Sequence, residues 1–194
     1  MDVYAILIWY FRLLNDMGHM QRLHAIQVLK SWDKRGVYVF TTHMLAKLFS
    51  EDSLKSFHEG LHRLIMSHIL RRACRGIYVN EAAACFDGYV IERIARALRF
   101  GSYNYVSLES ALSEYGWISQ IPVDRLTVMT TGRKGVYETP YGTIEFTHTK
   151  RSVLDILAQT GVISARPLRI ATPETAWRDL KRVGRNIHLV EKRH

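Results

Sequence analysis

The chain has 194 residues, which is enough for one domain or for two small ones. Apolar residues make up 47% of the sequence and charged residues 23%, so the chain can bury a core and wholesale disorder is excluded. Lys and Arg number 27 against 18 Asp and Glu. The resulting formal charge of +9 favours a polyanionic partner, with nucleic acid ahead of a membrane surface.

Cysteine usage and the N-terminal segment both indicate a cytoplasmic protein without a membrane partner. Cys74 and Cys85 are too few for a disulfide framework, and their spacing fits neither CxxC nor a four-ligand zinc pattern. The apolar run at residues 3–11 is far shorter than the roughly 20 residues of a membrane span, and Asp2 argues against an export signal. We expect residues 1–16 to form an apolar helical extension that packs on the rest of the fold or on a second copy, in a homodimer or in cooperative binding on DNA.

Residues 17–84 have the pattern of a small helical domain that ends in a hairpin. Apolar residues recur mostly every third or fourth position over residues 21–32, which predicts a helix that ends at Gly36. A short apolar stretch at residues 37–40 follows. A second helix is expected over residues 43–49, with the hydroxyl of Thr41 or Thr42 as its N-cap.

A third helix is expected after the polar turn at residues 50–53. One face of this helix carries an apolar stripe, while small and charged side chains lie away from it and are free to touch a partner. The stripe comprises Leu54, Phe57, Leu61, Leu64 and Ile65, and the outward residues are Lys55, Ser56, Glu59, His62 and Arg63.

Two short β-prone runs, residues 69–72 and 77–80, meet at Arg75-Gly76, where glycine permits the positive φ of a tight hairpin. The order helix, helix, turn, helix, hairpin predicts a winged helix-turn-helix. In that fold the third helix enters the major groove of DNA and the hairpin lies along the phosphates.

Cations on the hairpin and on the third helix make double-stranded DNA the expected partner. Arg71, Arg72 and Arg75 would contact phosphates, so affinity should fall steeply with salt. The candidate DNA-binding residues are Thr42, Lys47, Ser53, Lys55, Ser56, Arg63, Arg71, Arg72 and Arg75. Two alternatives stay open: cations on an edge strand also discourage aggregation, and winged helices also dock proteins.

A competing motif lies in the third helix, where His58-Glu59-Gly60-Leu61-His62 satisfies HExxH. In zinc peptidases the two histidines of this motif hold the metal and the glutamate acts as general base. Glu81 would be the third ligand. The arginines between these residues would oppose the charge of the metal, so a zinc metallopeptidase is the alternative and the leading interpretation has no cofactor, metal or catalytic residue.

Residues 85–194 read as a mixed α/β domain, so the whole chain is expected to be α+β. A helix around residues 91–98 is followed by a strand that passes directly into a helix at residues 105–112, with Ser107 as its N-cap. Further strands are expected at residues 125–131, 136–139, 143–148 and 168–172. Thr172 should cap, and Pro173 open, a helix that runs through Leu180.

Several acidic and basic side chains of this domain are candidates for a function. Asp124, Glu138 and Glu145 lie in or near strands as nuclease carboxylates do, but no Glu-x-Lys follows with the required spacing. We therefore expect Glu138 and Glu145 to be cross-strand partners of other residues, namely Arg133, Lys134 or Lys150. The pairs Lys150-Arg151 and Lys181-Arg182 are expected to be solvated surface or a second basic patch.

Five segments in order over roughly residues 20–181 resemble the AbiEi-type antitoxins, transcriptional regulators of phage-defence systems. The segments are FTTHMLAKLF, LRRACRGIYV, YVSLESAL, VMTTGRKGVYETPYGTIEF and ATPETAWRDL. The resemblance implies a type IV antitoxin of an abortive-infection system. Its N-terminal winged helix binds inverted repeats in its own promoter, and its C-terminal antitoxin domain counteracts a nucleotidyltransferase-like toxin without a stable complex.

The resemblance also implies which residues bind DNA. Arg71, Arg72 and Arg75 stand in the wing motif of that family, and the third helix matches by position. The alternative within the same class is a plain winged-helix regulator with no toxin.

Overall fold

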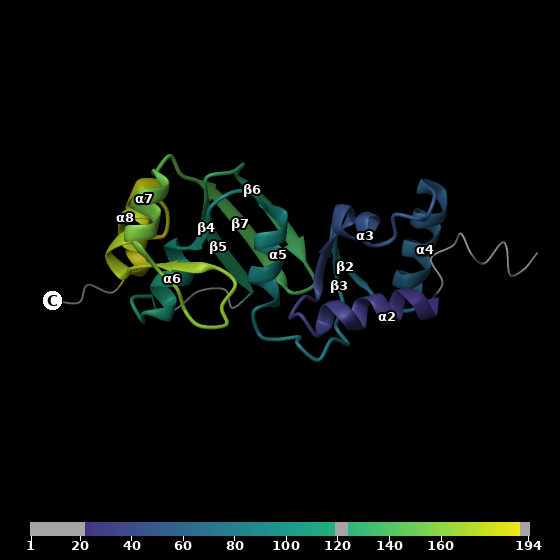
Figure 1. The fold of residues 1–194 in the computed structure, drawn as a ribbon. Coiled ribbons are helices and arrows are strands. Elements are labelled where there is room, and N and C mark those ends of the chain that lie inside the picture. Colours follow the sequence, from purple (N-terminus) through teal and green to yellow (C-terminus); the bar gives the residue numbers. More distant parts are fainter. Residues whose placement is uncertain (1–21, 119–123, 191–194) are drawn as a thin grey trace, which may run out of the picture. The chain divides into compact units, whose positions relative to one another are not determined.

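The structure, a computed structural model, describes residues 22–118 and 124–190 (Figure 1). The extension expected over residues 1–16 lies outside the described residues. The chain divides into a first unit, residues 1–86, and a second unit, residues 87–194, close to the expected boundary between residues 84 and 85. The described residues form seven α-helices and two β-sheets, so the mixed α+β class is confirmed.

The first unit combines three described helices with a three-stranded antiparallel sheet in which β3 is central. In chain order the elements are α2 (Arg22–Asp33), β1 (Val39–Thr41), α3 (Thr42–Leu48), α4 (Leu54–Met66), β2 (Arg71–Cys74) and β3 (Ile77–Val79). The three helices and the hairpin were predicted from the sequence. The apolar stretch after the first helix proves to be a strand, because it pairs with β3.

Local hydrogen bonds explain where the helices of the first unit begin. Thr41 is the N-cap of α3, and its hydroxyl accepts the N–H of Met44 at 3.0 Å. Ser53 caps α4 in the same way, accepting the N–H of Ser56 at 3.2 Å. The backbone N–H of Thr42 donates to the carbonyl of Gly76 at 2.9 Å, which fixes the start of α3 on the turn of the hairpin.

The core of the first unit lies where α4 meets the other helices and the sheet. Phe57, Leu61 and Leu64 are buried as expected. The predicted stripe is wrong at two positions, since Leu54 is 78% exposed and Ser56 is only 4% exposed. The buried face is rotated toward Ser56 and Gly60, which are four residues apart and therefore lie on the same side of the helix.

The second unit is built on a six-stranded mixed sheet with the order β6-β7-β5-β4-β9-β8. Its elements are α5 (Val90–Leu98), β4 (Asn104–Val106), α6 (Leu108–Glu114), β5 (Arg125–Thr130), β6 (Gly135–Thr139), β7 (Gly142–His148), α7 (Val153–Ala158), β8 (Thr160–Gly161), β9 (Arg169–Ala171), α8 (Pro173–Val183) and the 3-10 helix η1 (Ile187–Leu189). Strands β5 and β7 are parallel, as are β4 and β9, whereas β4 and β5 are antiparallel. The two parallel pairs therefore run in opposite directions.

Helices cover both faces of this sheet (Figure 1). Side chains of a strand alternate between faces, so residues of odd and even number on β7 mark the two sides. Gly142 lies against Ile91 of α5, whereas the carboxylate of Glu145 contacts Arg185, which follows α8. Helix α5 thus packs on one face, and α6 and α8 pack on the other.

The predicted caps of this unit fare differently. Thr172 caps α8 by accepting the N–H of Thr175 at 3.3 Å, and Pro173 is the first helical residue, as expected. Ser107 stands at the N-cap position of α6, as predicted, but its side chain makes no capping hydrogen bond, so the predicted capping role is wrong. Its hydroxyl instead donates to the buried carboxylate of Asp179 at 2.9 Å, because a carboxylate accepts a stronger hydrogen bond.

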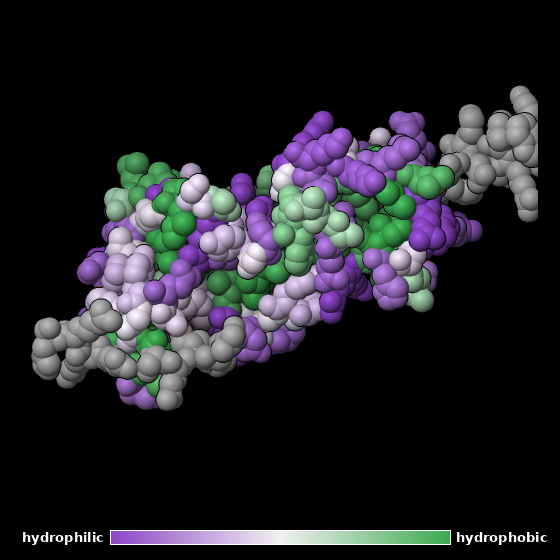
Figure 2. Space-filling model, turned by 90° about the horizontal axis from the view of Figure 1, so that it is seen from below, coloured by the Kyte–Doolittle hydropathy of each residue, from purple (hydrophilic) through white to green (hydrophobic). Residues whose placement is uncertain are grey.

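The surface is largely hydrophilic on the face seen in Figure 2, with green apolar patches between the purple regions. The exposed large apolar side chains include Leu23, Phe100, Leu154 and Val162. Of the helices in residues 22–118 and 124–190, none combines the length and the hydrophobicity needed to cross a bilayer.

Candidate nucleic-acid interface

Helix α4 presents a partly cationic outer face. The side chains of Ser53, Lys55 and Arg63 are exposed, as the sequence predicts for residues that contact a partner. Lys47, at the end of α3, is also exposed. Ser56 does not belong to this face, because its side chain is buried, so its prediction as a DNA-binding residue is wrong.

Thr42 has a structural role at the start of α3. Besides its backbone bond, its hydroxyl lies 3.4 Å from the carbonyl of Gly76 and donates to it. The Cβ position of Gly76, whose φ is +79°, is 3.5 Å from the same hydroxyl. Thr42 therefore ties the first turn of α3 to the tip of the hairpin and is only partly available to a ligand.

The arginines of the hairpin all reach solvent. Arg71, Arg72 and Arg75 are exposed in the structure, which rules out a location in the core. Arg71 forms an ion pair with Glu81 at 3.0 Å, a contact that the sequence did not predict and that offsets part of its charge. Because Arg71 and Arg72 are consecutive on β2, their side chains leave the strand toward opposite faces.

An open hollow of about 530 Å³ joins the end of α4 to the strand that carries the arginines. Ile65 and Met66 of α4 line it on one side, and Arg71 and Arg72 of β2 line it on the other. The helix and the strand therefore share a surface, although the two arginines start from opposite faces of β2.

The zinc alternative has little geometric support. His58 and His62 are exposed on α4, one turn apart. Glu81, the third expected ligand, is paired with Arg71. Within the described ranges, no three His, Cys, Asp or Glu side chains gather closely enough to hold a metal ion.

The segment that ends the first unit is fastened to the end of α2. The carboxylate of Asp33 accepts the backbone N–H groups of Ala84 and Cys85, each at 2.9 Å. A hydrogen bond from the side chain of Cys85, together with these two N–H groups, lowers the pKa of Asp33. The sequence offered no signal for this contact, because its partners lie far apart in the chain.

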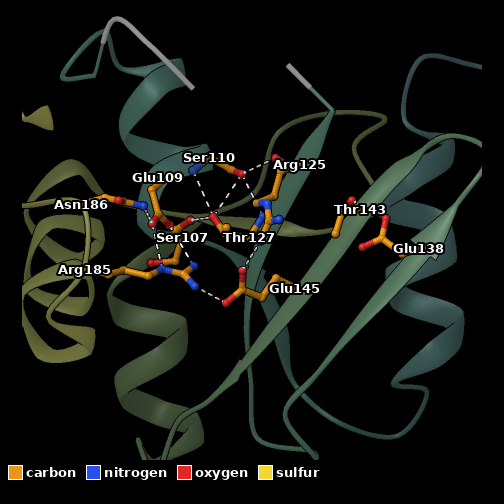
Figure 3. Close-up of polar contacts among 10 residues, drawn as sticks. All are labelled: Ser107, Glu109, Ser110, Arg125, Thr127, Glu138, Thr143, Glu145, Arg185 and Asn186. Carbon is orange, nitrogen blue, oxygen red and sulfur yellow. Dashed lines mark hydrogen bonds and ion pairs between the residues drawn. The ribbon is translucent and has the colours of Figure 1, made fainter. Parts of the chain in front are cut away.

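Two of the three candidate nuclease carboxylates in the second unit, Glu138 and Glu145, form other contacts (Figure 3). Glu145 forms ion pairs with Arg185 and, at 2.8 Å, with Arg125. Glu138 accepts the hydroxyl proton of Thr143 at 2.7 Å. The expected partners of Glu145 were therefore wrong, since the cations that pair with it come from the start of β5 and from beyond α8.

Arg185 joins the chain after α8 to α6 as well as to the sheet. Its guanidinium donates to the carboxylate of Glu109 at 2.9 Å, and the amide of Asn186 donates to the same carboxylate at 2.9 Å (Figure 3). Glu109 is 5% exposed, so this ion pair is largely shielded from solvent. The cluster joins α6, β7 and the segment after α8.

A second ionic contact holds α8 against the sheet. Asp179 on α8 is fully buried and pairs with Arg151 at 2.7 Å. The hydroxyls of Ser107 and Tyr105 also donate to it, at 2.9 and 3.3 Å. Burial, followed by the charge of Asp179, raises the pKa of Tyr105 to about 12.

These contacts correct the expected second basic patch. Arg151 is not solvated surface, because it supplies the counter-charge of Asp179. Lys150, Lys181 and Arg182 are exposed as expected. Lys181 also lies over the ring of Trp177 at 5.2 Å.

A third ionic contact holds the loop before β9. Arg166 contacts Glu92 on α5 at 2.5 Å and Glu114 on α6 at 2.6 Å. Burial raises the pKa of Glu92, although its bonds to Arg166 act in the opposite direction. This contact has no local signal in the sequence, because its three members lie on separate elements.

Comparison of the chain with protein-family models, with curated proteins and with solved structures finds no match.

Proposed function

We propose that the first unit is a winged-helix domain that binds double-stranded DNA, and that the protein is a type IV antitoxin. In this role it represses its own operon by binding inverted repeats in the promoter. It also counteracts a nucleotidyltransferase-like toxin without forming a stable complex with it. The function belongs in the cytoplasm, where the operon and the toxin are found.

The order and pairing of the elements support the winged-helix assignment. Helix α2, strand β1, helices α3 and α4 and the hairpin β2–β3 follow one another as in that fold. Strand β1 pairs with β3, so the hairpin is held beside the helices. The bonds from Thr42 to Gly76 join α3 to the hairpin tip directly.

The observation that carries the proposal is the hollow shared by α4 and β2. Arg71 and Arg72 line the hollow on the side of β2, and Arg63 is exposed on α4, the helix that lines the other side. A groove of DNA places phosphates on either side of an inserted helix, and cations on a neighbouring strand can then neutralise them. Exposed arginines in that arrangement favour a duplex over a solvated edge.

The test is the salt dependence of binding to a labelled duplex from the promoter of the gene that encodes this chain. Replacing Arg71, Arg72 and Arg75 by alanine should lower the slope of log K against log salt by about 2 to 3, since each phosphate contact contributes about 0.9. A matched control removes three exposed cations elsewhere in the same unit, namely Arg22, Lys30 and Lys34. The control should leave most of the slope intact.

Two results would overturn the proposal. If both triple variants change the slope equally, binding depends on net charge and the hairpin has no special role. If the variants bind DNA as expected but co-expression of the chain does not restore growth to cells that carry the adjacent toxin gene, the protein is a plain regulator. The first result would contradict the proposed DNA interface at the hairpin. The second would contradict only the antitoxin role.

A further inference from the structure

The second unit carries an exposed aromatic turn, residues 99–103, between α5 and β4. Phe100 is 89% exposed and Tyr103 is 44% exposed, although apolar rings of this size are normally covered. Neither ring is used in the contacts described above.

The aromatic turn is held in a fixed conformation by hydrogen bonds. The amide of Asn104 donates to the carbonyls of Arg99 and Ser102, at 3.1 and 2.9 Å. The N–H of Ser102 also donates to the carbonyl of Arg99 at 3.0 Å. Phe100 is thus presented to solvent by a braced turn, which lowers the entropic cost of binding a ligand there.

Two further segments are fastened to the aromatic turn. Tyr103 exchanges two hydrogen bonds with Thr131, each at 3.0 Å, and the guanidinium of Arg99 donates to the carbonyl of Arg133 at 2.8 Å. The ring of His148 lies 2.9 Å from the carbonyl of Gly132. The turn, the basic loop at residues 131–134 and the end of β7 therefore form one surface.

This surface is strongly cationic. Residues 96–103, 131–137 and 147–151 contain no Asp or Glu. Arg96, Arg133, Lys134 and Lys150 are exposed, and none of the ion pairs among the described residues includes them. Arg96 belongs to the last turn of α5, the helix that leads into the aromatic turn.

The charge of Arg99 is also uncompensated by an acid. Its guanidinium contacts the hydroxyl of Tyr137 at 3.0 Å and lies over the ring of Phe146 at 4.3 Å. These partners are neutral. Arg99 therefore braces the surface and adds to its positive potential at the same time.

The location fits a ligand site. Strands β5 and β7 are parallel and both end here, at Thr130 and His148. In open α/β sheets, ligands commonly bind beyond the carboxyl ends of parallel strands.

We propose that this surface binds single-stranded nucleic acid, with a base stacked on Phe100, a second base against Tyr103, and phosphates held by Arg133, Lys134 and Lys150. An exposed ring beside cations suits a single strand, because its bases have free faces for stacking whereas those of a duplex are stacked on one another. A phenylalanine ring also has no group with which to read base edges by hydrogen bonding. This activity is separate from duplex binding by the first unit.

The test measures binding of the full chain to fluorescent 12-nucleotide oligo(U) and oligo(dT) by anisotropy. Replacing Phe100 by alanine should weaken binding by about 5- to 150-fold, which corresponds to the roughly 1–3 kcal/mol that stacking of one base contributes. Phe100→Trp should retain binding, because tryptophan also stacks. The two oligonucleotides report whether RNA or DNA is preferred.

Controls separate this site from the rest of the protein. Leu154→Ala truncates another apolar side chain that is 79% exposed in the same unit and should leave binding unchanged. Arg133→Ala with Lys134→Ala should reduce the salt slope, whereas Lys181→Ala with Arg182→Ala should not. Replacing Arg71, Arg72 and Arg75 should affect the duplex and leave the oligonucleotides bound, so the two proposals fail independently.

Three results would overturn the inference. The first is a loss on Phe100→Ala no larger than the loss on Leu154→Ala, with both variants folded by circular dichroism. The second is no binding of either oligonucleotide by the intact chain. The third is binding of anionic phosphatidylserine vesicles, but not of oligonucleotides, in a manner that depends on Phe100, which would identify the surface as a membrane contact.

Discussion

Replacing Arg151 by methionine should destabilise the second unit strongly. The substitution keeps a side chain of similar length and removes the positive charge that pairs with Asp179 at 2.7 Å. Asp179 is fully buried, whereas the side chain of Arg151 is 16% exposed. The variant would therefore leave a buried carboxylate without its counter-charge.

The size of the effect follows from that burial. Removing one partner of a buried ion pair typically costs about 3–5 kcal/mol. Ser107 and Tyr105 still donate to Asp179 in the variant, which places the expected loss near the lower end, at about 3 kcal/mol. For a unit of this size each kcal/mol lowers the melting temperature by about 4–8 °C, so a decrease of roughly 12–24 °C is expected.

Thermal and urea unfolding followed by circular dichroism would measure this loss. The neighbouring Lys150 is exposed, so Lys150→Met should change stability by no more than about 0.5 kcal/mol. Combining Arg151→Met with Asp179→Asn should recover much of the lost stability, because no charge is then left buried. Equal melting temperatures for the Arg151 and Lys150 variants would refute the reasoning.

Two further predictions concern the second unit. Gly142 has a φ of +118°, and a Cβ there would lie 2.4 Å from the carbonyl oxygen of Asp124, so Gly142→Ala should cost about 2–5 kcal/mol in urea unfolding. Gly184→Ala, where φ is +77° and nothing lies within 4 Å, should cost only about 1–2 kcal/mol, and equal losses would show that the close contact is unimportant. The pKa of Tyr105 is raised from its ordinary value of 10.0 to about 12, so folding favours the protonated phenol. The contribution of this proton to the free energy of unfolding is complete below pH 10.0 and is lost as the pH rises toward 12. Tyr105→Phe should flatten this part of the stability curve, and an unchanged slope in the variant would contradict the assignment.

Elements with local signals could be predicted from the sequence. The caps at Thr41 and Thr172 were predicted correctly, because a hydroxyl three residues before a free N–H needs only its own neighbourhood to form the bond. The hairpin was recognisable because Gly76 adopts a positive φ between two apolar runs. In each case the information lies within a few residues.

Contacts between distant segments could not be predicted in this way. Glu145 pairs with Arg185, 40 residues away, and Asp33 binds the N–H of Cys85, 52 residues away. Nothing in the local pattern selects these partners over nearer charges. The exposure of the hairpin arginines was predictable because charged side chains are rarely buried, whereas the pairing of Arg71 with Glu81 was not.

Because the strands of the second unit run in opposite directions, the aromatic turn and the cluster of Glu109 and Arg185 lie at opposite ends of its sheet. Strands β5 and β7 finish beside the aromatic turn, while β4, which is antiparallel to β5, finishes beside the cluster of Glu109 and Arg185. The six residues of β5 span roughly 17–20 Å, well beyond the 7–10 Å within which substitutions usually influence one another. Substitutions in the aromatic turn should therefore leave the Glu109–Arg185 cluster intact. Changes in the free energy of unfolding caused by variants at the two ends should be additive.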